Sequence, residues 1–394
     1  MIYLHVPFCG SFCTYCDFYS EICRSRQASN EYADAVIAEI RDRRKELEMN
    51  MSAQDAVNTL YIGGGTPSVL PLDVLSRIVG AVSQTERLSL VTEQLSLVTE
   101  PVEVTTPTEL FDEFTVEVNP EDIVEKGREY VRGLLALGVN RISMGIQSFN
   151  DDILRWMNRR HDAGNAVKAF HILRESGVRN ISIDLIFGIS QLTDETWKDT
   201  IEKALELSPE HISAYQLSIE EGSALAKMVA DGRYVEASEE QCRRQYDILC
   251  RCLGRSGYHH YEISNFAKPG FEAVHNSAYW RRAPYIGLGP GAHSLTGNVR
   301  SWNSQELPHR SPDGSSATYS RTSETLSPED IRVERNMLSL RTDKGLKATE
   351  LYSLTDSTVV DALLSEGALE RQGASIRIPE DHLFTSDEII RELI

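Results

Sequence analysis

The chain has 394 residues, of which 41% are hydrophobic and 25% charged, so it can bury one large core and a smaller one. A formal net charge of −19 disfavours general binding to nucleic acid or to an anionic membrane surface. Because the sequence has no apolar run long enough to span a bilayer and no apparent signal peptide, we expect a cytoplasmic protein without a membrane span.

Short apolar segments alternate with amphipathic ones in the first half of the chain. Buried strands are expected at residues 2–6, 59–62, 114–118, 141–147, 181–187 and 211–217. Helical periodicity predicts helices at residues 32–47, 72–82, 130–137, 166–175 and 195–205. Six β–α repeats predict an α/β fold, a partial (β/α)6 TIM-like barrel, with ligands at the carboxyl ends of its strands.

Two segments interrupt this alternation. The hexapeptide LSLVTE occurs twice within residues 85–107, where we expect an inserted surface loop, and residues 304–327 have the composition of a linker. Beyond them, expected helices at 331–340, 348–354, 359–366 and 386–393 and a strand at 375–378 predict a small winged-helix-like α+β domain. We therefore expect a core barrel (1–235), a region packed on it (236–303), the linker (304–327) and a C-terminal domain (328–394).

Three of the seven cysteines crowd directly behind the first strand, as Cys9, Cys13 and Cys16 in the spacing C-x3-C-x2-C. In a reducing compartment this pattern favours metal binding over disulfides. Thiolates suit iron–sulfur clusters, and three of them on a four-iron cluster leave one iron open to a small molecule. A zinc site completed by His5 or Cys23 is the alternative, although structural zinc sites usually present four ligands in two separated pairs.

Polar residues and glycines follow the later strands. A glycine run at residues 63–65 lets backbone approach a ligand closely. Side chains expected in or near strand ends are Glu117, Gln147 and Asp184, followed by Arg159. Converging polar groups suit a ribose and an amino acid zwitterion, whereas a single strand-end carboxylate can also cap a helix.

The cysteine spacing, with Tyr15 before the third cysteine, resembles the motif of the radical S-adenosylmethionine (SAM) superfamily. This resemblance implies a [4Fe–4S] cluster on Cys9, Cys13 and Cys16, whose open iron binds the amino and carboxylate groups of SAM. It also implies a reductant for the cluster, since electron transfer cleaves the sulfonium to a 5′-deoxyadenosyl radical.

Nearly the whole chain is similar to the oxygen-independent coproporphyrinogen III oxidase family. The matching stretches are residues 3–9, 63–67, 117–120, 145–150, 158–159 and 183–188. The resemblance implies a SAM pocket lined by Tyr3, Tyr15, Gly64, Gly65, Thr66, Glu117, Gln147, Arg159, Asp184 and Ala214. Arg159 suits the carboxylate because of its planar fork. We also expect His293, in a glycine-rich turn, to border the nucleoside.

That family has at least two branches. The decarboxylating oxidases carry a fourth cysteine two residues after the third, where this chain has Phe18. The other branch, of HemW-type heme chaperones, is similar in residues 16–20 and in the signature H-N-x-x-Y-W, here His275, Asn276, Tyr279 and Trp280. The resemblance implicates this signature in heme binding.

The chemistry of the signature agrees, because imidazole can ligate heme iron and aromatic faces can cover a porphyrin. Arg281 and Arg282 follow and can oppose the propionates. A surface loop with a hydrogen-bonded histidine and two packing aromatics is the alternative. His259 and His260 are neighbours in an expected strand and point to opposite faces, so we expect this pair to be structural.

These observations predict a heme chaperone that binds heme and transfers it to an apo-hemoprotein. The alternative is oxidative decarboxylation of coproporphyrinogen III to protoporphyrinogen IX, and a radical enzyme with an unrelated substrate is a third option. A homodimer is compatible with each of these functions.

Overall fold

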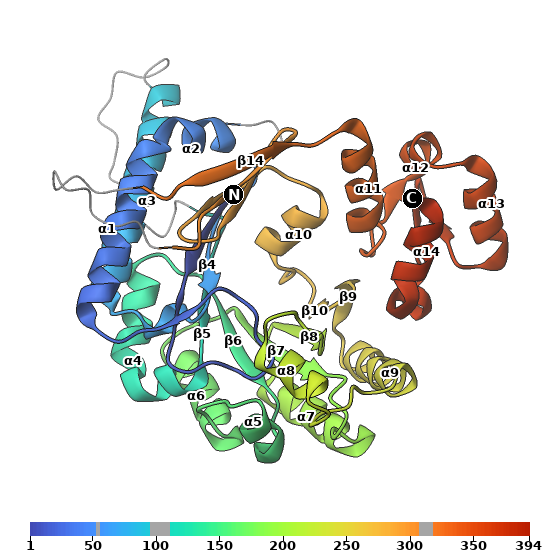
Figure 1. Cartoon of the computed structure of the whole chain (residues 1–394), viewed down its shortest axis with the longest axis horizontal. Helices are drawn as coiled ribbons and strands as arrows, with labels where there is room; N and C mark the ends of the chain where they lie inside the picture. Colours follow the sequence, from blue (N-terminus) through green and yellow to red (C-terminus); the bar gives the residue numbers. More distant parts are fainter. Residues whose placement is uncertain (53–55, 95–110, 307–317) are drawn as a thin grey trace.

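Six parallel strands in chain order form the centre of the fold (Figure 1). The computed structural model describes residues 1–52, 56–94, 111–306 and 318–394, with side chains for all of these except 85–94. The strands are β1 (Ile2–Val6), β4 (Thr59–Gly64), β5 (Glu113–Val118), β6 (Arg141–Gln147), β7 (Ile181–Phe187) and β8 (His211–Gln216). Each pairs in parallel with the next. The predicted partial (β/α)6 arrangement is confirmed.

Three further strands extend this sheet at both edges. β11 (Ile286–Leu288) lies parallel beside β1, while β10 (Asn265–Ala267) and β9 (His259–Glu262) continue antiparallel from β8. Residues 236–303, expected only to pack on the barrel, therefore contribute strands to its sheet. Long-range pairing of this kind leaves little trace in local periodicity.

Helices cover the outer side of the six parallel strands (Figure 1). They are α1 (Arg26–Asp42), α2 (Arg44–Met51), α3 (Leu72–Gln94), α4 (Pro120–Ala136), α5 (Asp151–Trp156), α6 (Ala163–Glu175) and α7 (Asp194–Leu207). In β7, Ile181, Ile183 and Leu185 are fully buried, whereas the alternate residues Ser182 and Asp184 line an interior cavity. The apolar core thus lies between sheet and helices, and the inner side of the sheet is free to be polar.

Arg43 divides the helix predicted at residues 32–47 into α1 and α2. Its buried guanidinium donates to the Glu39 carboxylate, to the Gly287 carbonyl at 2.6 Å and to Ser294 Oγ at 3.0 Å. A break at this point aims the side chain at β11 and at β12 (His293–Thr296), so the helix boundary depends on a contact remote in sequence.

The loops predicted at residues 85–107 and 304–327 are partly wrong, because each contains regular secondary structure. α3 continues to Gln94, so residues 85–94 are helical, consistent with a stretch that contains neither Gly nor Pro. The rest of the expected 85–107 insert lies outside the described residues. Within the expected linker, β14 (Arg321–Thr325) pairs with β13 (Val299–Asn303), which in turn pairs with β12. Its β-branched threonines favour a strand, which the overall Ser/Thr/Pro composition concealed.

The C-terminal domain has the predicted helices and a hairpin. It contains α11 (Pro328–Ser339), β15 (Leu346–Lys347), α12 (Ala348–Leu354), α13 (Ser357–Glu366), β16 (Glu370–Gln372), β17 (Ser375–Arg377), η3 (Glu380–Thr385) and α14 (Ser386–Leu393). The three strands form a separate sheet in the order β15-β17-β16. This domain lies beside β9 and α9 (Glu239–Arg255), where η3 contacts α9 (Figure 1).

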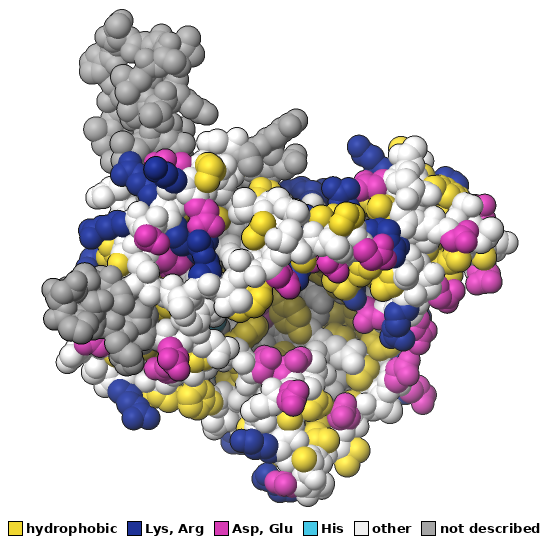
Figure 2. Space-filling view, turned by 45° about the horizontal axis from the view of Figure 1, so that its top comes forward, with side chains coloured by type: hydrophobic (Ala, Val, Ile, Leu, Met, Phe, Trp, Pro, Cys, Tyr) yellow, Lys and Arg dark blue, Asp and Glu magenta, His cyan; other side chains and the backbone are white. Residues whose placement is uncertain are grey.

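On the face in Figure 2, described basic side chains are scattered among acidic ones rather than gathered in a single patch. Among the described helices, none combines the length and apolar character that a bilayer crossing requires.

Candidate functional site

The cysteine motif forms a closed loop above the carboxyl ends of the strands. β2 (Phe8–Cys9) pairs with β3 (Glu21–Ile22), and this pairing ties the base of the loop together. At its tip, the Thr14 N–H donates to the Met157 carbonyl at 3.1 Å and its hydroxyl donates to the Trp156 carbonyl at 2.9 Å. The loop that carries Cys13 and Cys16 is therefore anchored to the segment that follows α5.

A cavity of about 670 Å³ opens beneath this loop inside the barrel. Predicted residues that line it are Cys9, Cys13, Tyr15, Cys16, Gly64, Gly65, Thr66, Glu117, Gln147, Arg159 and Asp184. They come from the cysteine loop, from the ends of β4 to β7 and from the segment after α5. The fold thus brings the three thiols and the predicted polar groups to one cavity.

The glycine run after β4 packs directly against Cys9. The Gly65 N–H donates to the Val6 carbonyl at 2.8 Å, and a Cβ on Gly65 would lie 3.0 Å from Cys9 Sγ. Gly64 has φ 109°, a conformation that side chains disfavour. At Gly65, a side chain would crowd the Cys9 thiol, so glycine is required at that position.

Two carboxyl groups of the cavity, on β5 and β7, have raised pKa values. Burial raises the pKa of Glu117 to about 7, aided by Asp184 and opposed by hydrogen bonds from Tyr61 Oη at 2.7 Å and the Gly64 N–H at 3.1 Å. Burial likewise raises the pKa of Asp184 to about 6, although Ser213 and Ser143 hydrogen-bond to it. Perturbed acids in a cleft are typical of functional sites.

Arg159 supplies the fixed positive charge of the cavity. Its Nη2 donates to Asn119 Oδ1 and to the Gly145 carbonyl, both at 2.7 Å, and its Nη1 lies 3.4 Å from Cys13 Sγ. Burial lowers the pKa of Arg159, but Tyr15, Cys13 and Glu121 raise it by more, so the guanidinium stays charged.

Two buried polar atoms at this cavity have no hydrogen-bond partner among the described residues, namely Arg159 Nε and Thr115 Oγ1. Buried donors without partners cost free energy, and a bound ligand relieves that cost. Three free thiols, a charged guanidinium and unpaired polar atoms around one cavity fit an iron–sulfur cluster and a polar, zwitterionic cosubstrate.

Gln147 carries backbone strain at the cavity wall. It has φ 70°, unusual for a residue other than glycine, and the pairing of β6 with β7 shifts register between Gly145 and Gln147. Such bulges re-aim side chains near active sites, which explains how Gln147 enters the cavity from the end of a strand.

Three predicted SAM residues are not among the residues that line the cavity. Tyr3 lies behind the wall, where its hydroxyl pairs with His5 Nδ1 at 3.0 Å, and the Ala214 side chain is buried in the sheet. His293, expected to border the nucleoside, lies on β12, stacked on Trp302 beside a separate depression. The glycine-rich turn near it faces β1 rather than the cavity, since a Cβ on Gly289 would meet the His5 carbonyl.

Neither proposed zinc ligand completes the cysteine motif. Both His5 nitrogens are occupied, by Tyr3 Oη and by the Tyr19 carbonyl at 3.0 Å. Cys23 Sγ lies 3.4 Å from Ser29 Oγ. Since neither side chain lines the cavity, the three-thiol interpretation is favoured.

The H-N-x-x-Y-W signature forms α10 (Val274–Trp280), a short helix under the amino ends of β4 and β5. The Glu113 carboxylate, at the start of β5, accepts from the backbone N–H groups of Val274 and His275 at 2.9 Å. Asn276 lines the cavity from below. The signature therefore closes the floor of the barrel rather than forming the surface loop that was the alternative.

His275 is buried within this floor. Its Nδ1 lies 2.8 Å from Thr59 Oγ1 and its Nε2 lies 3.1 Å from Tyr279 Oη. Burial lowers the pKa of His275 to about 3, so the imidazole is neutral. Beyond the helix, Arg281 is exposed, whereas Arg282 is paired with Glu334 at 2.7 Å.

The sequence analysis did not predict several other residues that line the cavity. These include Tyr61, Thr115, Arg141, Ser143, Ser182, His211, Ser213 and Tyr215. A signal was present, because polar residues alternate with apolar ones in β5 to β8, as in EFTVEV and ISIDLIF. That period of two marks one polar face on an otherwise buried strand.

The three-cysteine loop above a partial barrel of parallel strands defines a class of protein. The family model described as Radical SAM superfamily matches residues 3–204, and the chain belongs to this superfamily, whose members use a [4Fe–4S] cluster and SAM. The solved structure of coproporphyrinogen III oxidase (HemN) from Escherichia coli, a radical SAM enzyme, has the same fold. Its TM-score is 0.75 at 22% identity, covering 99% of this chain and 89% of that one.

Curated relatives narrow the assignment. The heme chaperone HemW of Lactococcus lactis is 33% identical, covering 87% of this chain and 82% of the relative. HemW of Bacillus subtilis is 34% identical, covering 78% and 74%. HemW of Mycobacterium tuberculosis is 30% identical, covering 100% and 94%. The chain belongs to the HemW family.

Proposed function

We propose that this chain is a heme chaperone, which binds heme and passes it to an apo-hemoprotein. The observation that carries the proposal is the relation to several HemW heme chaperones at 30–34% identity over most of both chains. Phe18, where the oxidase branch has a fourth cysteine, agrees with this choice.

In the barrel, Cys9, Cys13 and Cys16 would hold the [4Fe–4S] cluster, with Gly65 leaving room beside Cys9. When bound, the cluster and SAM supply one-electron reductive cleavage of the sulfonium, for which an external reductant is needed.

Arg159 suits the SAM carboxylate, because its Nε still lacks a partner among the described residues. Glu117 and Asp184 suit ribose hydroxyls or the ammonium group, since carboxylates accept hydrogen bonds from both.

Heme would be held at the signature segment, by His275, Asn276, Tyr279 and Trp280. His275 has a neutral imidazole, the form that ligates iron. Because His275 is buried and its Nε2 contacts Tyr279 Oη, we propose that heme ligation displaces this hydrogen bond and exposes the ring. For the propionates we favour Arg281, because Arg282 already pairs with Glu334.

Heme titration into purified protein, with and without the cluster, tests this proposal. His275→Ala should weaken heme binding and shift the Soret band while SAM binding persists. Tyr279→Phe keeps the aromatic face but frees Nε2, so heme should bind faster than to wild type. His293→Ala, an exposed histidine on β12, is the matched control and should behave as wild type.

An unchanged Soret band and heme affinity in His275→Ala would remove this residue from the heme site. Anaerobic incubation with coproporphyrinogen III tests the oxidase alternative. Formation of vinyl groups would contradict the chaperone assignment, whatever the heme titrations show.

A further inference from the structure

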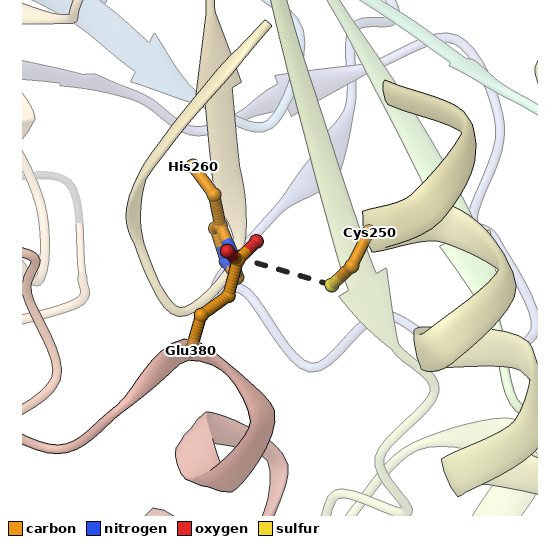
Figure 3. A group of neighbouring side chains, drawn as sticks. All are labelled: Cys250, His260 and Glu380. Atoms are coloured by element: carbon orange, nitrogen blue, oxygen red, sulfur yellow. Dashed lines mark hydrogen bonds and ion pairs between the residues drawn. The ribbon is translucent and has the colours of Figure 1, made fainter. Parts of the chain in front are cut away.

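Cys250, His260 and Glu380 converge from three separate elements outside the barrel cavity. Figure 3 shows the His260 ring and the Glu380 carboxylate facing one another, with the Cys250 sulfur turned towards them. His260 Nδ1 lies 3.1 Å from Glu380 Oε1 and 4.0 Å from Cys250 Sγ, and the ligand atoms lie within 4.8 Å of one another. We propose that these residues form a binding site for a divalent cation of the zinc type.

The orientation of His260 favours a cation. Its Nε2 lies 3.4 Å from the Ile263 carbonyl and 3.3 Å from Tyr246 Oη, and its ring stacks on Phe266 with centroids 4.1 Å apart. The Ile263 carbonyl, which also accepts from Tyr246 Oη at 2.9 Å, can accept a hydrogen bond from Nε2, and in that tautomer Nδ1 presents its lone pair to Cys250 and Glu380. Hydrogen bonding of the distant nitrogen is how proteins orient metal-binding histidines.

The Nδ1 contact with Glu380 is compatible with a hydrogen bond or with a shared cation. A carboxylate only accepts, so Nδ1 either donates its own hydrogen to Glu380, in a neutral or a doubly protonated ring, or shares a metal ion with it. An ion pair alone would explain the histidine and the carboxylate. The adjacent thiol adds a third donor, and thiolates contribute to metal sites rather than to ion pairs with carboxylates.

The donor set and its spacing suit zinc. Zinc accepts sulfur, nitrogen and oxygen together, whereas magnesium and calcium prefer oxygen alone. Tetrahedral zinc would place sulfur and nitrogen about 3.5 Å apart and nitrogen and oxygen about 3.4 Å apart, from its usual bond lengths. The observed 4.0 and 3.1 Å differ by a few tenths of an ångström. Side-chain rotation closes that gap, since Glu380 is 61% exposed, and water can fill the fourth position.

The site would connect the C-terminal domain to the sheet. Cys250 lies on α9 and His260 on β9, at the sheet edge, whereas Glu380 begins η3. One ion would therefore tie η3 of the C-terminal domain to α9 and to the edge of the sheet. Nothing in this role depends on the radical SAM chemistry, because none of the three residues lines that cavity.

The chain offers a neighbouring control for each ligand. Test variants are Cys250→Ser, His260→Gln and Glu380→Gln, and their controls are Cys252→Ser, His259→Gln and Asp381→Asn. Full-length protein with its cluster installed is incubated anaerobically with zinc and desalted, and zinc and iron per chain are measured. Zinc affinity follows from competition with a chromophoric chelator.

We expect one zinc per chain in wild type and in the three controls. Each test variant should bind zinc at least tenfold more weakly, with unchanged iron. Cobalt should give a thiolate charge-transfer band that Cys250→Ser abolishes. Glu380 is exposed, so Glu380→Gln remains informative if the other two variants fold poorly. Wild type that retains no zinc, or test variants equal to their controls, would overturn the proposal and leave an ion pair beside a thiol.

Discussion

Replacing Glu117 by Gln should flatten the dependence of stability on pH and weaken SAM binding. The carboxyl group has its pKa raised from 4.5 to about 7. The folded state therefore binds more protons than the unfolded state between these values, so stability falls as pH rises through them. The loss is complete above pH 7 and absent below pH 4.5.

The size of this effect follows from the shift. The rise in the pKa of Glu117 from 4.5 to about 7 corresponds to a loss of roughly 3 kcal/mol in the free energy of unfolding at pH 8. Glu117 is partly exposed to the cavity, and screening there reduces the effect, so we expect about 2 kcal/mol. A Gln amide is neutral at every pH, and it loses one hydrogen bond from Tyr61 or Gly64, a cost of about 1 kcal/mol that does not vary with pH.

The assay is urea denaturation of cluster-free protein at pH 5, 6, 7 and 8. The free energy of unfolding of wild type should fall by about 2 kcal/mol more than that of Glu117→Gln across this range. At pH 8, where the Glu117 carboxyl group is ionised, the SAM affinity of the cluster-loaded variant should drop at least tenfold, because a charged acceptor is lost, by a typical ~1.5 kcal/mol or more.

Glu262→Gln is the matched control. Burial also raises the pKa of Glu262 to about 7, but this residue lies on β9 and is not among those lining the cavity. It should flatten the pH dependence similarly and leave SAM affinity unchanged. Parallel pH profiles of Glu117→Gln and wild type would refute the idea that the fold holds this carboxyl group protonated.

Two further predictions concern the cluster and the insert. Replacing Cys9, Cys13 or Cys16 with Ala should abolish an oxygen-sensitive cluster, as measured by iron and sulfide analysis. The controls Cys242→Ala and Cys252→Ala should retain the cluster. Stoichiometric zinc without sulfide in wild type would contradict the cluster assignment. Replacing residues 95–107 of the expected insert with a few Gly and Ser residues should leave cluster content and thermal midpoint nearly unchanged, because the sequence predicts an inserted loop there and such loops tolerate shortening. Loss of folded protein would show that the segment belongs to the core.

Sequence patterns predicted the six strands and their order because both follow from local regularities. Buried parallel strands are short apolar runs, and consecutive β–α units place neighbours in sequence side by side in the sheet. The errors occurred where local composition was ambiguous. Residues 85–94 suit a helix as well as a loop, and residues 321–325 form a strand only because β13 offers an edge.

The sequence by itself determined the cluster motif, because Cys9, Cys13 and Cys16 are close along the chain and need only one loop to meet. Tertiary structure alone decided which distant residues join them. Glu117 and Asp184 share a cavity because parallel strands end at one rim, and α10 becomes its floor because Glu113, 161 residues before Val274, caps its backbone. Contacts across such separations depend on how the sheet closes around its interior, which no local spacing encodes.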